Sequence, residues 1–284
     1  MTLWSRLQYA LPHHAISRLV GALARLRFRP LAQPLMRWFV RSYGVDLSDA
    51  TRGEVADYQS FNDLFTRELA DGARPLAGDE SVIVSPVDGT LSEFGPLDGP
   101  RLIQAKGRHY TAAELLADDA MAERFEGGTF ATIYLAPYNY HRIHFPSAGT
   151  VPLMRLVPGR LFSVNLATAA SVDRLFARNE RVVTPVEGPH GSCAMVAVGA
   201  LNVGSIQTTW HGIVTPPAGR SVRTWDYPEP AAYARGDTWG WFNLGSTVIL
   251  LWPRGAMALD DALHAGQVLR MGERLGAWSV GASG

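Results

Sequence analysis

The first fifty residues alternate apolar and basic positions with the spacing of a helix. One apolar stripe recurs at i, i+3, i+4, i+7 and i+10, and it comprises Ile16, Leu19, Val20, Leu23 and Leu26. The arginines at positions 18, 25 and 29 fall on the opposite face. Pro30 and Pro34 are expected to break this run, and a second short stripe follows with Leu31, Leu35, Trp38 and Phe39. The pattern predicts two amphipathic helices within residues 1–50.

Charge makes this region different from the rest of the chain. The 26 basic and 26 acidic residues cancel overall, which argues against a general nucleic-acid binder. Residues 1–50 nevertheless hold seven arginines and two acids, a net charge of +5, so the other 234 residues carry −5. Basic, apolar and aromatic positions together are typical of helices that lie in a membrane interface. A helical cap packed on the protein's own core, with its arginines in water, fits the same pattern.

The region after residue 81 has the pattern of a β protein. Short β-rich runs alternate with turns of Gly, Pro and Asp, as at Ser81–Val84, Thr129–Leu135, Ala194–Val198 and Thr247–Trp252. Helices are expected after Ser60 through Leu69, over Thr111–Phe125 and, more weakly, over Ser163–Phe176. The predicted fold class is α+β, with N-terminal amphipathic helices followed by a mainly β catalytic body. The expected division is a membrane-associating region, 1–50, and a catalytic domain, 51–284.

Neither a signal peptide nor a transmembrane helix is expected. Residues 7–17 are interrupted by Pro12, His13 and His14. The longest uncharged stretch, 191–219, contains prolines and several glycines and is better interpreted as buried strands joined by turns.

Composition excludes several kinds of chemistry. Cys193 is the single cysteine, so the chain can form no internal disulfide and lacks paired cysteines for zinc or iron–sulfur sites. Of the 26 basic residues 25 are arginine, and Lys106 is the one lysine available for a pyridoxal-phosphate Schiff base. No metal site is expected. If carbonyl–amine chemistry occurs here, the protein has reason to supply its own carbonyl.

Reactive side chains concentrate in three segments. Asp88 lies in Ser85-Pro86-Val87-Asp88-Gly89, where an ordinary turn role is the alternative. His141 and His144 lie in a dense polar run, Tyr138–Pro146, and histidine suits proton transfer near neutral pH. Ser246 follows Gly245 directly before a hydrophobic strand. The Gly245–Ser246 bond is either a tight turn or a scissile bond, since glycine permits strained backbone and exposes its carbonyl.

Asp88, His144 and Ser246 together suggest an acid, a base and a nucleophile. The Gly-x-Ser-x-Gly elbow of α/β-hydrolases is absent, because Val248 takes the place of the second glycine. An ordinary hydrolase is therefore disfavoured.

At these residues the sequence resembles the phosphatidylserine decarboxylase family. The resemblance covers about residues 58–275 and rests on many motifs in register rather than on one tetrapeptide. The motifs are Phe61–Arg67, Ser85–Gly89, Lys106-Gly107, Tyr140–His144, Pro158–Asn165, Phe176–Arg181, Val203–Ile206 and Leu244–Thr247.

The resemblance implies a self-processing carboxy-lyase that converts phosphatidylserine to phosphatidylethanolamine and CO2. Cleavage at Gly245-Ser246 would give a β subunit, 1–245, and a 39-residue α subunit, 246–284, as a heterodimer with further dimerisation left open. Ser246 would become a covalent pyruvoyl group that forms a Schiff base with the substrate. Asp88 would orient His144, His144 would deprotonate Ser246, and His141 would contact the substrate's carboxylate or phosphate. Phosphatidylserine in an anionic membrane is the expected partner, with the protein peripheral on the cytoplasmic side of the cell membrane.

Three alternatives remain at this point. The first is a sibling enzyme acting on an archaeal-type ether lipid. The second is a Ser-His-Asp hydrolase at the membrane, in which the bond before Ser246 stays intact. The third is a membrane-surface module without catalysis.

Overall fold

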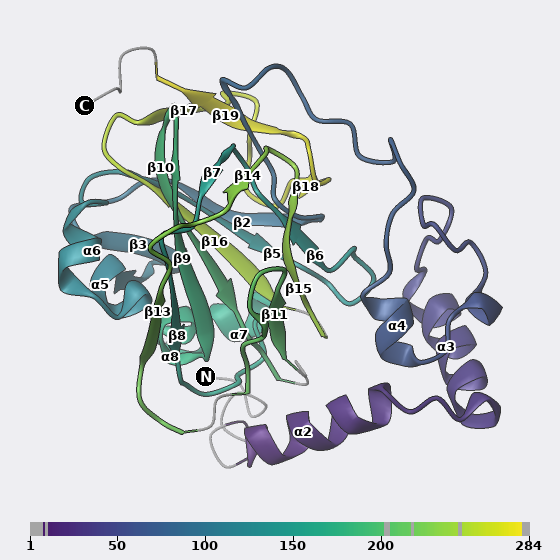
Figure 1. Ribbon diagram of the computed structural model, residues 1–284. Helices are drawn as coiled ribbons and strands as arrows, with labels where there is room; N and C mark the ends of the chain where they lie inside the picture. The colour runs from purple at the N-terminus through teal and green to yellow at the C-terminus, as the bar shows by residue number, and fades with distance from the viewer. Residues whose placement is uncertain (1–7, 9–10, 202–204, 217–218, 244–245, 280–284) are drawn as a thin grey trace.

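The computed structural model describes residue 8 and residues 11–201, 205–216, 219–243 and 246–279. Helices occupy the N-terminal part and antiparallel strands most of the remainder (Figure 1). The predicted α+β class is confirmed. Gly245, one side of the predicted scissile bond, lies outside the described residues.

The helical elements are short except for the first two. They are α2 (His13–Ala24), α3 (Arg29–Tyr43), the 3-10 turn η1 (Val55–Asp57), α4 (Phe61–Phe65), α5 (Ala112–Leu116), α6 (Asp119–Glu123), α7 (Leu166–Ala169) and α8 (Leu175–Arg178). Within the described residues, no helix combines the length and the hydropathy that a membrane crossing requires.

The largest sheet forms the centre of the body and contains ten strands. Its main path runs β13-β8-β9-β10-β16-β5-β2-β18, with β7 and β14 attached beside it. The strands are β2 (Gly89–Pro96), β5 (Thr129–Tyr134), β7 (Gly149–Thr150), β8 (Leu153–Val157), β9 (Arg181–Gly188), β10 (Gly191–Val198), β13 (Arg223–Asp226), β14 (Ala232–Tyr233), β16 (Thr247–Trp252) and β18 (Val268–Leu269). All six residues of β16 are buried, so the strand directly after Ser246 lies in the middle of the core.

Smaller sheets complete the body. One has the order β12-β11-β15-β6, with β6 (Arg142–His144), β11 (Ile206–Thr208), β12 (Gly212–Ile213) and β15 (Thr238–Phe242). Another has the order β1-β19-β17, with β1 (Val82–Val84), β17 (Met257–Leu259) and β19 (Arg274–Trp278). A hairpin joins β3 (Arg101–Ala105) to β4 (Arg108–Thr111). His144 ends β6, and its backbone N–H donates to the carbonyl of Pro86 at 2.9 Å, close in sequence to Asp88, which directly precedes β2.

Two helix predictions differ from the structure. Thr111–Phe125 forms two helices instead of one, because Ala117 takes a left-handed conformation and the Asp118 side chain caps the second helix. The weaker helix over Ser163–Phe176 is likewise two four-residue helices, α7 and α8. Ser60 caps α4 as predicted, although this helix ends at Phe65 instead of Leu69.

The prolines of the N-terminal region behave differently from expectation. Pro30 lies in the first turn of α3, where the missing N–H costs no helical hydrogen bond. Pro34 lies inside α3 without ending it. The packing of Met36 and Phe39 in a small apolar cluster offsets the hydrogen bond that Pro34 cannot make.

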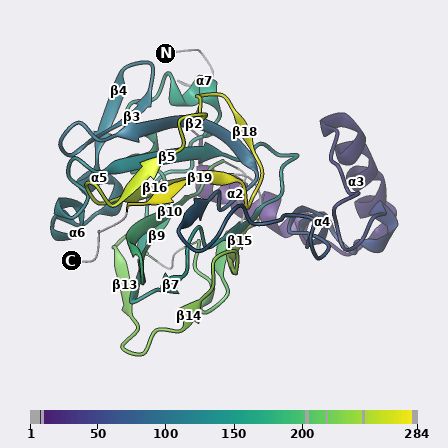
Figure 2. The ribbon, with the colours of Figure 1, turned by 90° about the horizontal axis from the view of Figure 1, so that it is seen from above.

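That small cluster is separate from the core of the β body. It joins α2 and α3 to α4 through Ala24, Ala32, Met36, Phe39, Val45, Leu47, Tyr58, Leu64 and Phe65. Figure 2 shows α3 and α4 standing beside the β body. The cluster crosses the predicted boundary at residue 50, and the division into two domains stays a prediction.

The predicted apolar stripe of α2 is only partly covered by the protein: Val20 packs against the small cluster, whereas Leu19, Leu23 and Leu26 are exposed. The residues that α2 buries are mostly small: His13, Ser17, Gly21 and Ala24. Leu19 is 63% exposed and Leu23 is 57% exposed, and in α3 Trp38 is 58% exposed. A cap packed on the protein's own core would bury these side chains, as Met36 and Phe39 of α3 are buried, so each interpretation describes part of the region and the membrane-associating role stays a prediction.

Candidate active site

Ser246 lies at the entrance to β16, between β10 and β5. Its carbonyl accepts a hydrogen bond of 2.8 Å from the backbone N–H of Leu135, which fixes the start of the strand. The Ser246 side chain is fully buried, and its hydroxyl has no hydrogen-bond partner within the described part of the chain. A buried hydroxyl without a partner is costly in an inert position. The hydroxyls of Thr247 and Thr132 nearby are also buried without a described partner, so this feature is compatible with a reacting Ser246 without being peculiar to it.

His144 is held as a neutral base by the atoms around it. Its Nδ1 lies 2.7 Å from the carbonyl oxygen of Gly236, which can only accept, so Nδ1 carries the proton and Nε2 has the lone pair. The Tyr140 hydroxyl donates to this Nε2 at 2.9 Å. Burial lowers the pKa of His144 below its usual value, against the opposing effect of the Gly236 carbonyl. His144 is consequently ready to accept a proton near neutral pH.

Asp88 is bound to an arginine rather than to His144. Arg74 approaches the two carboxylate oxygens at 3.0 and 2.7 Å, and the Met271 N–H donates to one of them at 2.8 Å. Arg74 also binds Asp49 at 2.7 Å. Asp88 and His144, both described, share no hydrogen bond, although the Asp88 charge acts to raise the pKa of His144. The orienting role of Asp88 therefore stays a prediction, and the Gly236 carbonyl orients the ring here.

His141 is completely buried and neutral. Its Nδ1 donates to the carbonyl oxygen of Asn139 at 2.8 Å, which leaves Nε2 as an acceptor without a partner among the described residues. Its ring packs on Phe65 with centroids 4.0 Å apart. Burial lowers the pKa of His141 to about 3. In this tautomer Nε2 can accept from a hydroxyl or an amine but cannot donate to a carboxylate or phosphate.

Three further residues belong to this site and were not singled out from the sequence. The Tyr140 hydroxyl donates a hydrogen bond to Nε2 of His144, and the Gly236 carbonyl accepts one from its Nδ1, which determines the tautomer. Arg74 forms an ion pair with the Asp88 carboxylate. Tyr140 stands within the polar run that marked the site, which was a usable signal. Arg74 and Gly236 lie in turns with no chemical motif, so only the folded chain brings them to the site.

The strand before the scissile bond is tied to helix α2. The Asn243 side chain donates to the Ser205 hydroxyl at 2.6 Å, and the Asn243 N–H donates to the Ser205 carbonyl at 2.8 Å. Arg25 of α2 donates to the same hydroxyl at 3.2 Å. The backbone N–H of Phe242 donates to the His141 carbonyl at 3.1 Å. These contacts connect the N-terminal region to the chain two residues before Gly245.

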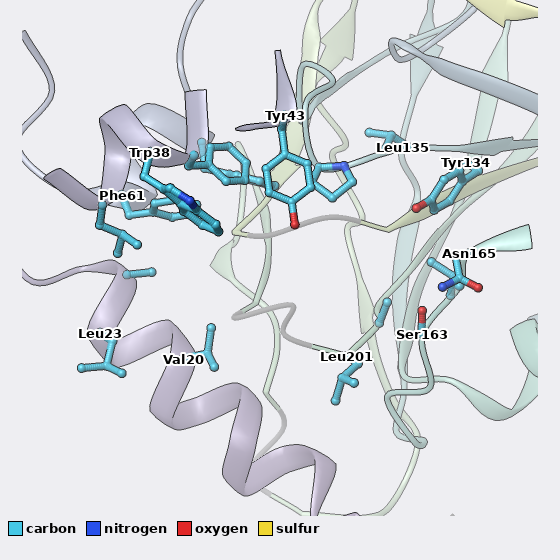
Figure 3. A pocket seen from close by; sticks show the side chains of 17 residues that line it. Val20, Leu23, Trp38, Tyr43, Phe61, Tyr134, Leu135, Ser163, Asn165 and Leu201 are labelled. Atoms are coloured by element: carbon cyan, nitrogen blue, oxygen red, sulfur yellow. The ribbon is translucent and has the colours of Figure 1, made fainter. Parts of the chain in front are cut away.

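An apolar cavity of about 450 Å³ lies between the N-terminal helices and the β body. In Figure 3, Val20 and Leu23 come from α2, Trp38 and Phe61 lie at one side, and Leu201 lies across from them. Leu135 and Tyr134 line the end toward the body. Leu135, one of the lining residues, also donates its N–H to the Ser246 carbonyl, whereas Ser246 itself does not line the cavity.

No group of three or more His, Cys, Asp or Glu side chains that could hold a metal ion occurs among the described residues.

The chain is similar to known proteins over nearly its whole length. A family model described as phosphatidylserine decarboxylase matches residues 61–277, and a second, described as PSD, matches residues 3–44. The phosphatidylserine decarboxylase proenzymes of Shewanella sp. (strain W3-18-1) and Shewanella putrefaciens are 50% identical to it over 273 residues, covering 94% of each chain. The proenzyme of Photobacterium profundum is 49% identical over 272 residues, again covering 94% of each chain.

Proposed function

The chain belongs to the phosphatidylserine decarboxylase family, and from this premise we propose that it is a carboxy-lyase that converts phosphatidylserine to phosphatidylethanolamine and CO2. The reaction uses a pyruvoyl group that the chain makes from its own Ser246. The single observation that carries this proposal is the buried Ser246 hydroxyl, which has no partner among the described residues and directly follows Gly245. "Proenzyme" in the names of the relatives supports self-processing.

Self-cleavage begins with attack of the Ser246 hydroxyl on the Gly245 carbonyl carbon. Nε2 of His144 takes the hydroxyl proton, and the amide becomes an ester as the Ser246 nitrogen takes up a proton. Loss of the Ser246 Cα proton then breaks the Cβ–O bond, which releases residues 1–245 with a terminal carboxylate. The remaining dehydroalanine reacts with water and loses ammonia, leaving the carbonyl on residues 246–284.

The pyruvoyl group supplies a carbonyl that condenses with the substrate's amine and accepts the electron pair left by CO2. His141 would accept a hydrogen bond from the substrate's amine, because its Nε2 is a neutral acceptor without a partner among the described residues. His144 carries the proton to the substrate carbon. Since burial lowers its pKa, the protonated ring is a stronger acid than an exposed histidine. Asp88 supports the positive ring through its charge.

The apolar cavity between the helices and the body takes the lipid part of the substrate. Its walls are mostly aromatic and aliphatic, and one lining residue, Leu135, is hydrogen-bonded to the Ser246 carbonyl. Leu19, which does not line this cavity, lies in the membrane surface together with the exposed parts of Leu23 and Trp38, which also line the cavity, and the arginines of residues 1–50 are attracted to anionic lipid. The protein is therefore peripheral, on the cytoplasmic side of the membrane.

The two fragments stay together as a heterodimer after cleavage. β16 belongs to the small fragment, yet it pairs with β10 on one side and β5 on the other, both from the large fragment. β19 of the small fragment also pairs with β1. Cutting one bond at the start of β16 removes none of these ladder hydrogen bonds.

The test is denaturing mass spectrometry of the purified chain combined with an assay of phosphatidylserine in anionic vesicles. The active preparation should contain residues 1–245 and a 39-residue fragment whose N-terminus is blocked. Ser246→Ala should remain one inactive chain, while Ser192→Ala, at a partly exposed serine of the same body, should cleave normally. An active but uncut chain would overturn the proposal and favour the hydrolase alternative.

A further inference from the structure

A second cavity, of about 700 Å³, lies beside the N-terminal half of α2 and shares no lining residue with the apolar cavity. Five basic side chains line it: His14, Arg18, Arg160, Arg178 and Arg220. None of the described lining residues is acidic. The size is that of an ordinary small-molecule site. Arg160 and Arg178 belong to the motifs Pro158–Asn165 and Phe176–Arg181, for which the decarboxylation chemistry gives no role.

The backbone holds two of these arginines side by side. The Arg160 N–H donates to the Arg178 carbonyl at 2.8 Å, and the Glu180 N–H donates to the Arg160 carbonyl at 2.8 Å. A Cβ atom at Gly159 would lie 2.5 Å from the Arg178 carbonyl oxygen, so glycine permits this close approach. The positions of the two cationic residues are therefore fixed by the fold.

Helix α2 closes the cavity through contacts of its first turns. His14 Nε2 donates to the Gly159 carbonyl at 2.9 Å, and the Leu161 N–H donates to His13 Nδ1 at 3.4 Å. The Arg18 guanidinium in turn donates to the His14 carbonyl at 3.2 Å. Arg18 is thereby held at the cavity beside the 158–161 segment, so the site is formed before any ligand arrives.

Placing the guanidinium groups of the four arginines around one cavity has an electrostatic cost, because like charges repel each other. The Cζ atoms of Arg160 and Arg178 lie 6.0 and 5.5 Å from the centre of the same ring, that of Phe162. The acid next to this segment, Glu180, is buried, and burial raises its pKa to about 7 while Thr215 binds its carboxyl. An anion bound between the guanidinium groups offsets the repulsion between like charges. Arginine forks match the oxygens of phosphate in particular.

We propose that this cavity binds a phosphate-bearing anion, at a site separate from the reacting centre at Ser246. The source that fits its position is the headgroup of an anionic phospholipid in the membrane on which the enzyme sits. Arg18, at the cavity, directly precedes Leu19, which points outward from α2. Binding of phosphate itself does not depend on the proposed function, whereas its assignment to a lipid rests on the proposed membrane surface.

The experiment measures binding of the full chain to two kinds of probe at fixed ionic strength. One is vesicles of phosphatidylcholine with or without phosphatidylglycerol, and the other is inorganic phosphate followed by calorimetry. Arg160→Gln/Arg178→Gln should lower affinity for the anionic vesicles about tenfold or more, because charge-assisted hydrogen bonds are lost. The matched control Arg101→Gln/Arg254→Gln removes the same charge from exposed positions of the β body, outside the cavity and outside residues 1–50, and should show only a small decrease.

Each outcome decides the proposal. A selective loss on anionic vesicles supports a lipid site, and a selective loss of inorganic phosphate binding supports the site with free phosphate as its source. Equal losses in the two double variants overturn it, since diffuse attraction would then explain all binding. Arg18→Gln/Arg220→Gln changes two exposed residues and provides the same test if the first variant does not fold. If the chain cleaves at Ser246 but shows no selective binding, only the proposed anion site is wrong. If it binds selectively but does not cleave, only the proposed function is wrong.

Discussion

The helical region and the β body use apolar residues in opposite ways. In the body, β16 buries all six of its residues and joins a core that extends through the sheets. In α2, small residues such as Ser17 and Gly21 face the protein, while Leu19 and Leu23 face outward. Helical periodicity reveals that a helix has an apolar face, but it does not reveal what covers that face. Here much of the larger apolar face is left uncovered by the described residues.

The largest effect should come from the body. His144→Gln removes the proposed base and should slow self-cleavage by a factor on the order of 10²–10⁴, the usual contribution of general base catalysis. Binding to anionic vesicles should be unchanged. Time-resolved denaturing gels and vesicle sedimentation measure the two properties. His264→Gln, at an exposed histidine of the body, is the control. Cleavage at the parent rate would show that His144 is not the base.

The next effect belongs to the helical region. Leu19→Ser/Leu23→Ser should weaken vesicle binding by on the order of 100-fold. Full burial of a leucine contributes about 1.5–3 kcal/mol, and the membrane can bury only the part of each side chain that is still exposed, which is 63% for Leu19 and 57% for Leu23. Cleavage should continue. Val268→Ser, at a body residue that is 67% exposed, should not affect sedimentation. If all three chains bind vesicles equally, the stripe is not the membrane surface.

These surface changes separate the two regions better than a truncation does. Deleting residues 1–45 would remove Met36 and Phe39 from the small apolar cluster that contains Phe65. Phe65 packs on His141, so the truncation would disturb the catalytic body as well.

Acid should destabilise the body through its buried histidines. The pKa of His141 is lowered to about 3, so below pH 6.5 the unfolded chain binds a proton that the folded chain does not. The free energy of unfolding should therefore fall as pH decreases from about 6.5, by about 2 kcal/mol at pH 5 for this residue. Urea unfolding of uncut Ser246→Ala measures it, and His141→Phe should reduce the pH dependence. An unchanged slope in the double variant would contradict the assignment to His141.

The smallest effect tests the connection between the two regions. Arg25→Gln removes the hydrogen bond from α2 to Ser205, which also binds Asn243 near the scissile bond. One hydrogen bond of about 1 kcal/mol corresponds to cleavage slowed about fivefold. Quantified cleavage time courses measure this change, with Arg41→Gln as the charge-matched control. Identical rates for the two variants would make the regions independent in cleavage.

Local pattern predicted most of the fold but less of the site. Periodicity identified β5, β10 and β16, and the side chain of Ser60 identified the start of α4. Periodicity predicted a single helix where the structure has α5 and α6. The residue between them that takes the left-handed conformation is Ala117, and an alanine does not indicate a helix end as a glycine would. Motifs singled out Asp88, His141, His144 and Ser246 as candidates, and their roles stay predictions. The motifs did not reveal Arg74 as the partner of Asp88, because that pairing depends on how the turn before β1 packs against β18.

The central position of β16 would change the thermodynamics of the molecule once the Gly245–Ser246 bond ahead of this strand is cut. An uncut chain folds by a unimolecular equilibrium, whereas two fragments that share a central strand have a stability that depends on their concentration. Dilution then lowers the temperature of unfolding, and a strand that must find its place between two others across separate molecules reassembles slowly. The mature enzyme would thus keep a structure that forms readily only before cleavage, while the two fragments are still one chain. Its lifetime would then depend on the rate at which it unfolds and not on the equilibrium free energy of unfolding.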